Sequence, residues 1–266
     1  MGIDAASFRD PEGFVFYNDN KVYRAITNPN APILSIQYSE FFSTAIAQEF
    51  LVPFSHCDTH LDEAVVPRGE VPSSIELEQL DCVSYPYEWS YGQLKKAALL
   101  TLDISILALR HGLTVKDASA FNIQFHKGAP MFIDHLSFVK SDGVLPWAAY
   151  SQFCRHFLYP LAVGAYHSFH VNGLFRNFLD GLDSQMAVDL LPVRATLKPY
   201  ILLHNRFIKK YIMSTRQGVR RGKKSLQAPL LQHLRTFIHG LNAGHEKKIN
   251  GVITIVTIIM TNVRRS

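Results

Sequence analysis

Cysteine is scarce in this chain of 266 residues, which has three: Cys57, Cys82 and Cys154. They are too few and too scattered to build a disulfide scaffold or a zinc site. No secretory signal sequence opens the chain, and the default location of such a protein is the cytoplasm. We therefore expect a cytoplasmic protein that is long enough to bury a core of its own.

The N-terminal part also lacks a glycine-rich phosphate-binding loop, because Gly13 stands alone beside the first strand pattern. No apolar run approaches the roughly 20 residues that a membrane-spanning helix needs, so we expect no transmembrane segment. The most apolar segment, 249–263, is rich in β-branched residues. It could form an added edge strand or be a terminus under weaker constraint, and the sequence favours neither.

Charged residues make up 18% of the chain and hydrophobic residues 47%, a composition typical of a globular protein. The net charge of +5 is uneven, since residues 190–245 contain 11 Lys and Arg and no Asp or Glu. An acidic body with a basic C-terminal third has a polarity that suits docking. The basic loop 216–224 has no interleaved aromatic residue for base stacking. We favour a solvated linker there and do not expect nucleic-acid binding.

The most informative stretch is a long helix pattern followed by a loop and a hairpin. Apolar residues recur at helical spacing through 96–111, and Gly112 follows as a stop signal. Residues 122–125 and 130–133 then read as two short strands joined by a turn. Three oxygen-bearing residues fall at the junctions: Asp117 in the loop, Asn122 at the start of the first strand and Asp134 at the end of the second.

These residue types are the ones that phosphoryl transfer asks of a protein. Mg²⁺ prefers oxygen ligands, usually one or two carboxylates with phosphate and water completing its shell. Asn122 and Asp134 would be the metal ligands, and Asp117 would be the base or orienting group for the attacking hydroxyl. The alternative is structural: Asp117 caps a turn, Asn122 satisfies a loop backbone and Asp134 begins a turn.

Residues 14–17 and 22–26 flank a turn-forming Asn-Asp-Asn and have the signature of a hairpin. Lys21 or Arg24 could be its phosphate-binding cation, with Arg24 on the strand face opposite its two neighbours. We favour an exposed strand cation for both. A helix predicted over 39–50 carries two glutamates that could pair with this cation, although solvated charges are the favoured interpretation.

A short strand is predicted over 80–85, and it leads into the aromatic residues Tyr87 and Trp89 before Ser90 or Trp89 begins the next helix. In a two-lobed phosphotransferase this is the place where the lobes join and an adenine ring lies. Tyr87 and Trp89 are therefore candidate cofactor-binding residues together with Arg24. The alternative is an aromatic cluster that covers the top of the core.

Histidine occurs in two further patterns. His56, Cys57, Asp58 and His60 resemble a set of metal ligands, but no helix or hairpin pattern fixes their geometry, so we favour a polar loop. A second histidine, His156, lies in a largely apolar helix pattern over 147–166, which Pro160 kinks or divides. With Arg155 it could serve a site, but we favour a core or interface histidine.

The stretch 96–138 resembles the protein-kinase-like superfamily, whose catalytic loop reads His-Arg-Asp-x-x-x-x-Asn and whose metal-binding turn reads Asp-Phe-Gly. Here Val115-Lys116 replaces His-Arg, and Asp134-His135-Leu136 replaces Asp-Phe-Gly. The resemblance implies an α+β, two-lobed fold with a small β-containing N-terminal lobe and a mainly helical C-terminal lobe. It also implies ATP and Mg²⁺ as cofactors.

Residues 10–215 are similar to a more particular family, the N-terminal module that precedes a class I S-adenosylmethionine-dependent methyltransferase domain in bacterial proteins. Some of these proteins are labelled as host-specific nodulation proteins of rhizobia. The residues that carry the similarity are Ser84–Ser90, Gln93–Lys95, Lys116–Asn122, Phe132–Asp134 and Tyr150–Cys154. It implies a methyltransferase domain or protein as the partner.

A methyltransferase domain of that class needs a strand, a Gly-x-Gly-x-Gly turn and a helix, with an acidic residue further on. No such run follows Leu190, and Gly218–Gly222 carries cations and follows no strand. We therefore expect the leading module alone, truncated or stand-alone, with S-adenosylmethionine bound only if a separate methyltransferase domain is supplied.

The expected organisation is an arm at 1–12, the small lobe at 13–88, the helical lobe with the Asp/Asn/Asp site at 89–215, and a basic linker, helix and apolar tail at 216–266. The expected function is that of a non-catalytic or weakly catalytic kinase-like module. The alternative is a phosphotransferase that uses Mg·ATP on a small molecule, whose identity the sequence does not reveal.

Overall fold

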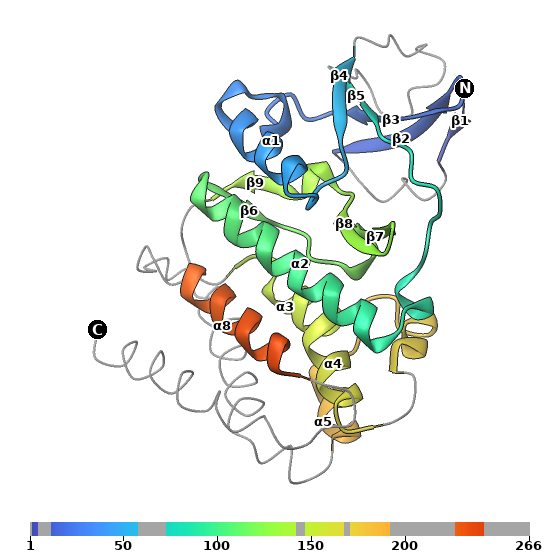
Figure 1. Ribbon diagram of the computed structural model, residues 1–266, viewed down its shortest axis with the longest axis vertical. Helices are drawn as coiled ribbons and strands as arrows, with labels where there is room; N and C mark the ends of the chain where they lie inside the picture. The colour runs from blue at the N-terminus through green and yellow to red at the C-terminus, as the bar shows by residue number, and fades with distance from the viewer. Residues whose placement is uncertain are drawn as a thin grey trace.

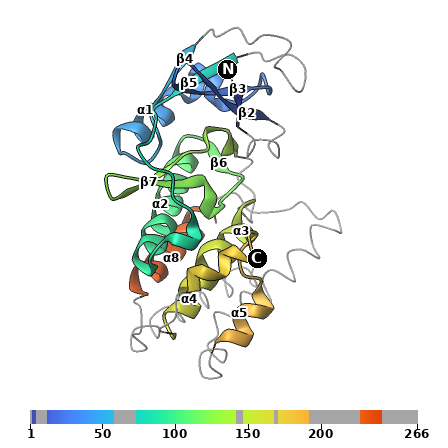
Figure 2. The same ribbon diagram turned by 90° about the vertical axis from the view of Figure 1, so that its right-hand side faces the viewer.

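The computed structural model describes residues 2–4, 12–57, 73–141, 147–167, 171–191 and 227–241. Strands and helices are mixed: a five-stranded sheet and α1 (Ser39–Ala47) lie at one end, and most of the helices lie at the other (Figures 1 and 2). Three features that the sequence singled out lie outside the described residues: the basic loop 216–224, the tail 249–263, and Asp58 with His60. No helix in the described ranges is long and apolar enough to cross a membrane.

The sheet is antiparallel, with the strand order β1-β2-β3-β5-β4. Its strands are β1 (Gly2–Ile3), β2 (Gly13–Asn18), β3 (Lys21–Ile26), β4 (Phe54–Cys57) and β5 (Ser73–Leu77). The predicted hairpin is confirmed, because Asp19 and Asn20 turn β2 into β3 with positive φ angles of 47° and 60°. This left-handed pair is the turn that fits the twist of two adjoining strands, and Asn and Asp tolerate it well.

The two faces of this sheet are buried differently. Phe14, Phe16, Tyr23 and Ala25 form a small cluster on one face, where the rings of Phe16 and Tyr23 stack with centroids 5.1 Å apart. The opposite face contributes Ile26 and Ile75 to the main core. Arg24 is directly paired with Ile75, so alternation places its side chain on this inner face.

Strands β4 and β5 were missed, and the strand predicted over 80–85 is wrong. In the described chain residues 80–85 form no strand, and the amide of Ser84 donates to the side chain of Gln124 at 2.8 Å. A strand depends on a partner for its backbone, and short apolar runs do not show which of them will find one.

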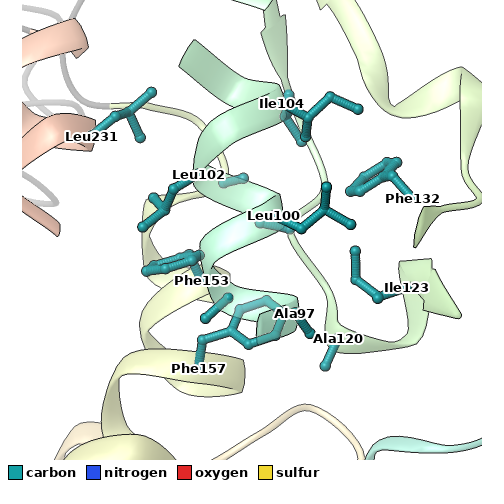
Figure 3. Packing of buried hydrophobic residues seen from close by; sticks show 14 of the residues in the cluster. Ala97, Leu100, Leu102, Ile104, Ala120, Ile123, Phe132, Phe153, Phe157 and Leu231 are labelled. Carbon is teal, nitrogen blue, oxygen red and sulfur yellow. The ribbon is translucent and has the colours of Figure 1, made fainter. Parts of the chain in front are cut away.

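Helix α2 (Tyr91–Arg110) is the central helix of the molecule, and the packing around it is shown in Figure 3. Ser90 caps its start, since its hydroxyl accepts the amide of Gln93 and the Gln93 side chain accepts the amide of Ser90. Gly112 ends it with a φ of +74°, as its position in the sequence predicted. The helix begins at Tyr91, directly after Ser90, which was one of the two predicted starts; apolar periodicity alone reached back only to residue 96.

Two layers pack against opposite sides of α2. On one side lies the hairpin of β7 (Ile123–His126) and β8 (Ala129–Phe132), which presents Ile123 and Phe132 to Leu100 (Figure 3). On the other side lie Phe153 and Phe157, from the helical segment that follows residue 147. The residues just after α1 pair with β8 as well, since the amide of Val52 donates to the carbonyl of Phe132 at 3.0 Å. The hairpin therefore joins the sheet end to the helical end.

The helix predicted over 147–166 is divided in three: α3 (Tyr150–Phe153), the π-helix η7 (Cys154–Leu158) and α4 (Tyr159–Gly164). Pro160 has no amide hydrogen and cannot continue the α-helical pattern of hydrogen bonds. The amide of Tyr159 reaches back to the carbonyl of Cys154, one residue further than in an α-helix. The predicted break at Pro160 is thus present, and the backbone adapts to it in the preceding turn.

The remaining elements are short, apart from α8. They are η2 (Pro32–Leu34), η3 (Ile36–Tyr38), η4 (Pro86–Glu88), β6 (Leu113–Val115), η5 (Ala120–Asn122), η6 (His135–Ser137), β9 (Phe138–Lys140), η8 (Val171–Arg176), α5 (Ser184–Leu190) and α8 (Gln227–Gly240). Helix α8 packs on α2 through an apolar face that includes Leu231. Arg235 pairs with Asp103 of α2, and Lys95 donates to the carbonyl of His239 at 2.9 Å. This helix, expected in the C-terminal linker and tail, is therefore part of the helical core.

Candidate functional site

The hairpin and the loop before it bring the three predicted site residues together. Asp117 follows β6, Asn122 closes the short helix η5 directly before β7, and Asp134 follows β8 and caps η6. The amide of Ile133 donates to the carbonyl of Asn122 at 2.9 Å, so the two ends of the hairpin are held side by side. The order helix, loop, hairpin thus places the residues as the sequence predicted.

Ser137 links Asn122 to Asp134, and sequence reasoning missed it. Its hydroxyl donates to Oδ2 of Asp134 at 2.5 Å and accepts from Nδ2 of Asn122 at 3.4 Å. Nδ2 of Asn122 also donates to the carbonyl of Asp117 at 3.3 Å. Ser137 is fully buried, and the only signal for it in the sequence is a serine three residues after an aspartate.

The carboxylate of Asp117 is held in a partly buried position. Oδ1 accepts the amide of Ser119 at 2.9 Å. Burial raises the pKa of Asp117 above its usual value, and the negative charge of Asp134 raises it further. The hydrogen bonds from Ser119 and from the side chain of Gln152 lower this pKa and so oppose the shift. Asp134 therefore lies close enough to Asp117 for its charge to affect the protonation of that carboxyl.

Arg24 reaches this cluster from the sheet. Its Nη2 lies 3.1 Å from Oδ1 of Asp134, and the two side chains are only 12% and 18% exposed. The favoured interpretation of Arg24 as an exposed strand cation is therefore wrong. That description fits Lys21, which is 56% exposed and pairs with Glu76 at 2.8 Å. Glu40 of α1 is 82% exposed and lies near His111, so it is the solvated charge that we favoured.

The residues that differ from the kinase-like pattern are packed tightly. His135 is buried, its Nε2 lies 2.8 Å from the carbonyl of Val52, and its ring meets the ring of Phe54 edge-on at 5.1 Å. Burial lowers the pKa of His135 to about 4, so the ring is neutral at physiological pH. Leu136 lies against β2, where a Cβ added to Gly13 would stand 2.7 Å from Cδ1 of that leucine.

A second ion pair crosses between the sheet and this loop. Lys116, which stands directly before Asp117, pairs with Glu12, the residue before β2. Both side chains are about one-third exposed. The start of β2 is thus fixed to the Asp117 loop by this pair and to Leu136 by the close approach at Gly13.

The two aromatic candidates have different surroundings. Trp89 is 2% exposed, its Nε1 donates to Oγ of Ser84 at 2.9 Å, and Phe125 meets its ring edge-on at 5.1 Å. These surroundings fit the alternative interpretation of Trp89, that of an aromatic cluster that covers the core. Tyr87 stacks on Tyr85 at 5.3 Å on the surface of the molecule. The adenine-binding role of both candidates stays a prediction.

The donor set of the site is two carboxylates and one amide. In the described residues, no group of three or more His, Cys, Asp or Glu side chains is placed to hold a metal ion. Among the same residues, the side-chain amide of Asn122 bonds through Nδ2, and its Oδ1 makes no hydrogen bond. Asp117, Asp134 and this oxygen are therefore the groups that could meet a hard cation such as Mg²⁺.

Comparison with known proteins adds one relative to this description. No protein-family model matches the chain. The chain is similar to the nodulation protein NoeA of Rhizobium meliloti (strain 1021), with 34% identity over 205 residues. The match covers 76% of this chain and 42% of NoeA, so the chain spans less than half the length of this relative. The resemblance to rhizobial nodulation proteins is confirmed to that extent.

Proposed function

We propose that this chain is a kinase-like module of a nodulation-related protein, with a degenerate Mg·ATP site that binds a nucleotide and turns it over weakly or not at all. The observation that carries this proposal is that Asn122 bonds both to the backbone of Asp117 and to Ser137, which in turn bonds to Asp134, with Arg24 added from the sheet. In an active kinase the cation of the sheet pairs with a glutamate of a helix and the metal-binding aspartate holds the ion, so the Arg24–Asp134 pair supports a degenerate site.

The residues present fit a magnesium ion. Asp134 and the amide oxygen of Asn122 would hold it, since both are hard oxygen donors at adjoining ends of one hairpin. When bound, the ion would neutralise charge on the phosphates. Asp117 would orient the hydroxyl of an acceptor.

Weak turnover is inferred from the groups around these residues. Lys116 stands where a kinase has arginine, and it is engaged by Glu12. His135 and Leu136 replace the Phe-Gly of the metal-binding turn and are both buried. The backbone at Gly13 packs on Leu136, where a glycine-rich loop would have to leave space for phosphates. These features support binding more strongly than catalysis.

The link to nodulation rests on the similarity to NoeA. Because the chain matches 42% of that protein, we propose that it acts with a further domain or protein, and the resemblance to modules that precede methyltransferases favours a methyltransferase in that role. S-adenosylmethionine would then bind to the partner and not to this chain. A pull-down with the methyltransferase as a separate chain tests this part independently of the nucleotide site.

An active phosphotransferase is the second candidate, and one observation favours it. The raised pKa of Asp117 makes this carboxylate a better proton acceptor than a fully solvated aspartate, as a base for a small-molecule hydroxyl would need. The measurement is ADP release by the wild type and by Asp117→Asn with a panel of hydroxylated small molecules. Turnover that Asp117→Asn abolishes would establish this candidate over the first.

The experiment for the main proposal is a thermal shift with Mg·ATP. The wild type should be stabilised, and Asp134→Asn should lose the stabilisation because it removes a metal ligand. Asp103→Asn is the matched control: it also removes an aspartate paired with an arginine between two elements, but on the α2–α8 face. An absent shift for the wild type with every nucleotide tried would reject a nucleotide site.

A further inference from the structure

The loop that carries Asp117 is fixed from outside by one helical segment. Three side chains of residues 147–156 bond to its backbone, at Val115, Ala118 and Ala120. Nε1 of Trp147 donates to the carbonyl of Val115 at 2.7 Å. The amide of Ala118 donates to Oε1 of Gln152 at 2.8 Å, and the amide of Ala120 donates to Nδ1 of His156 at 3.3 Å.

The spacing along this segment explains how it matches the loop. Gln152 and His156 are four residues apart, so they lie on the same face of the helix. The change from α3 to the π-helix η7 occurs between them. Such π-turns are rare and frequently occur at functional sites, because the extra residue in the turn shifts the side chains around it. Here the irregular turn faces the loop that holds Asp117.

Gln152 touches both the backbone and the carboxylate of this loop. Its oxygen accepts the amide of Ala118, and its side chain also hydrogen-bonds the carboxylate of Asp117. Only a carboxamide has both an acceptor and a donor at the same end of a side chain of this length, since an ionised glutamate would only accept. The bond to the carboxylate is therefore specific to glutamine at this position.

We infer that Gln152 is the positioning residue of the proposed site. Its side chain ties the peptide after Asp117 to the carboxylate of Asp117 and holds that carboxylate toward Asn122 and Asp134. This inference rests on the function proposed above. Trp147 and His156 hold the two ends of the same loop and do not contact the carboxylate in any hydrogen bond of the described residues. All three side chains thus share a loop-holding role, and among the three Gln152 alone also bonds the carboxylate and so has an orienting role.

Two substitutions separate these roles. Gln152→Met removes both bonds of the side chain at similar size. Gln152→Glu keeps an acceptor for the amide of Ala118 but offers no donor to Asp117, and at neutral pH it repels that carboxylate. The matched control is Gln124→Met, because Gln124 is also buried and its Oε1 also accepts a backbone amide, that of Ser84 at 2.8 Å.

The test measures Mg·ATP affinity and amide exchange in the full chain. Both Gln152 variants should bind Mg·ATP about tenfold more weakly, the effect of one lost charge-assisted hydrogen bond, whereas Gln124→Met should bind like the wild type. Gln152→Glu should retain slow exchange at Ala118, and Gln152→Met should not. A glutamate that only attracted cations would strengthen binding, so weaker binding of Gln152→Glu is diagnostic. Wild-type affinity in both Gln152 variants would overturn the inference.

The failure of the proposed function can be told apart from the failure of this inference. If the wild type binds no Mg·ATP, the proposed function fails and nuclear magnetic resonance decides the inference. The side-chain amide signals of Asn122 should then move in both Gln152 variants and stay in place in Gln124→Met, because Asn122 bonds to the Asp117 backbone. Unmoved Asn122 signals in the Gln152 variants would show that Gln152 does not organise the site.

Discussion

Breaking the ion pair between Arg24 and Asp134 should cost more stability than breaking an ion pair on the surface of the same strand. Its side chains are 12% and 18% exposed, so little water screens the 3.1 Å contact. Removing one partner of a buried pair costs about 3–5 kcal/mol. Asp134 keeps its bonds from Ser137 and Leu136, so we expect about 2 kcal/mol for Arg24→Met.

The assay is a double-mutant cycle by urea denaturation with Arg24→Met, Asp134→Asn and the double variant. We expect a coupling free energy of about 1–2 kcal/mol, since the second substitution removes a charge that the first has left unpaired. The control cycle uses Lys21 and Glu76, which are 56% and 32% exposed and should couple by less than about 1 kcal/mol. Additive effects in the Arg24–Asp134 cycle would refute the view that this pair joins the sheet to the hairpin.

Three further substitutions test other parts of the structure. His135→Phe should lessen the loss of stability on acidification. The folded-state pKa of His135, about 4, lies below the unfolded value of 6.5, so the stability contributed by the neutral ring is complete above pH 6.5 and falls as pH drops to about 4. An unchanged pH profile of urea unfolding would contradict this. Leu231→Ala should cost about 2–4 kcal/mol in the same assay if α8 is part of the core, and a cost near zero would detach α8 from it. Gly181→Ala should lower the melting temperature, because φ is +76° and the new Cβ would lie 2.5 Å from the carbonyl of Arg155; a gain in stability would contradict that geometry.

Local signals in the sequence predicted local structure well. The Asn-Asp-Asn turn, the helix start at Ser90 or Trp89 and the Gly112 stop are each signalled within a few residues, so the β2–β3 hairpin and α2 followed from them. The convergence of Asp117, Asn122 and Asp134 was predictable for a related reason. A hairpin of fixed register brings its two ends together without help from distant residues.

Contacts between distant parts of the chain were not predictable in this way. The burial of Arg24 depends on which face of the sheet meets the hairpin, and the roles of Ser137 and Gln152 depend on which segments pack beside the loop of Asp117. The docking of α8 joins residues more than 130 positions apart, through Arg235 and Asp103. Neither periodicity nor capping carries information about such pairs.

Direct titration of Mg·ATP by calorimetry tests the central claim most sharply, with the wild type, Asp134→Asn and Asp103→Asn measured in the same buffer. The account predicts binding by the wild type and by Asp103→Asn and none by Asp134→Asn. Heat of binding that is absent in the wild type, or that survives unchanged in Asp134→Asn, would contradict it.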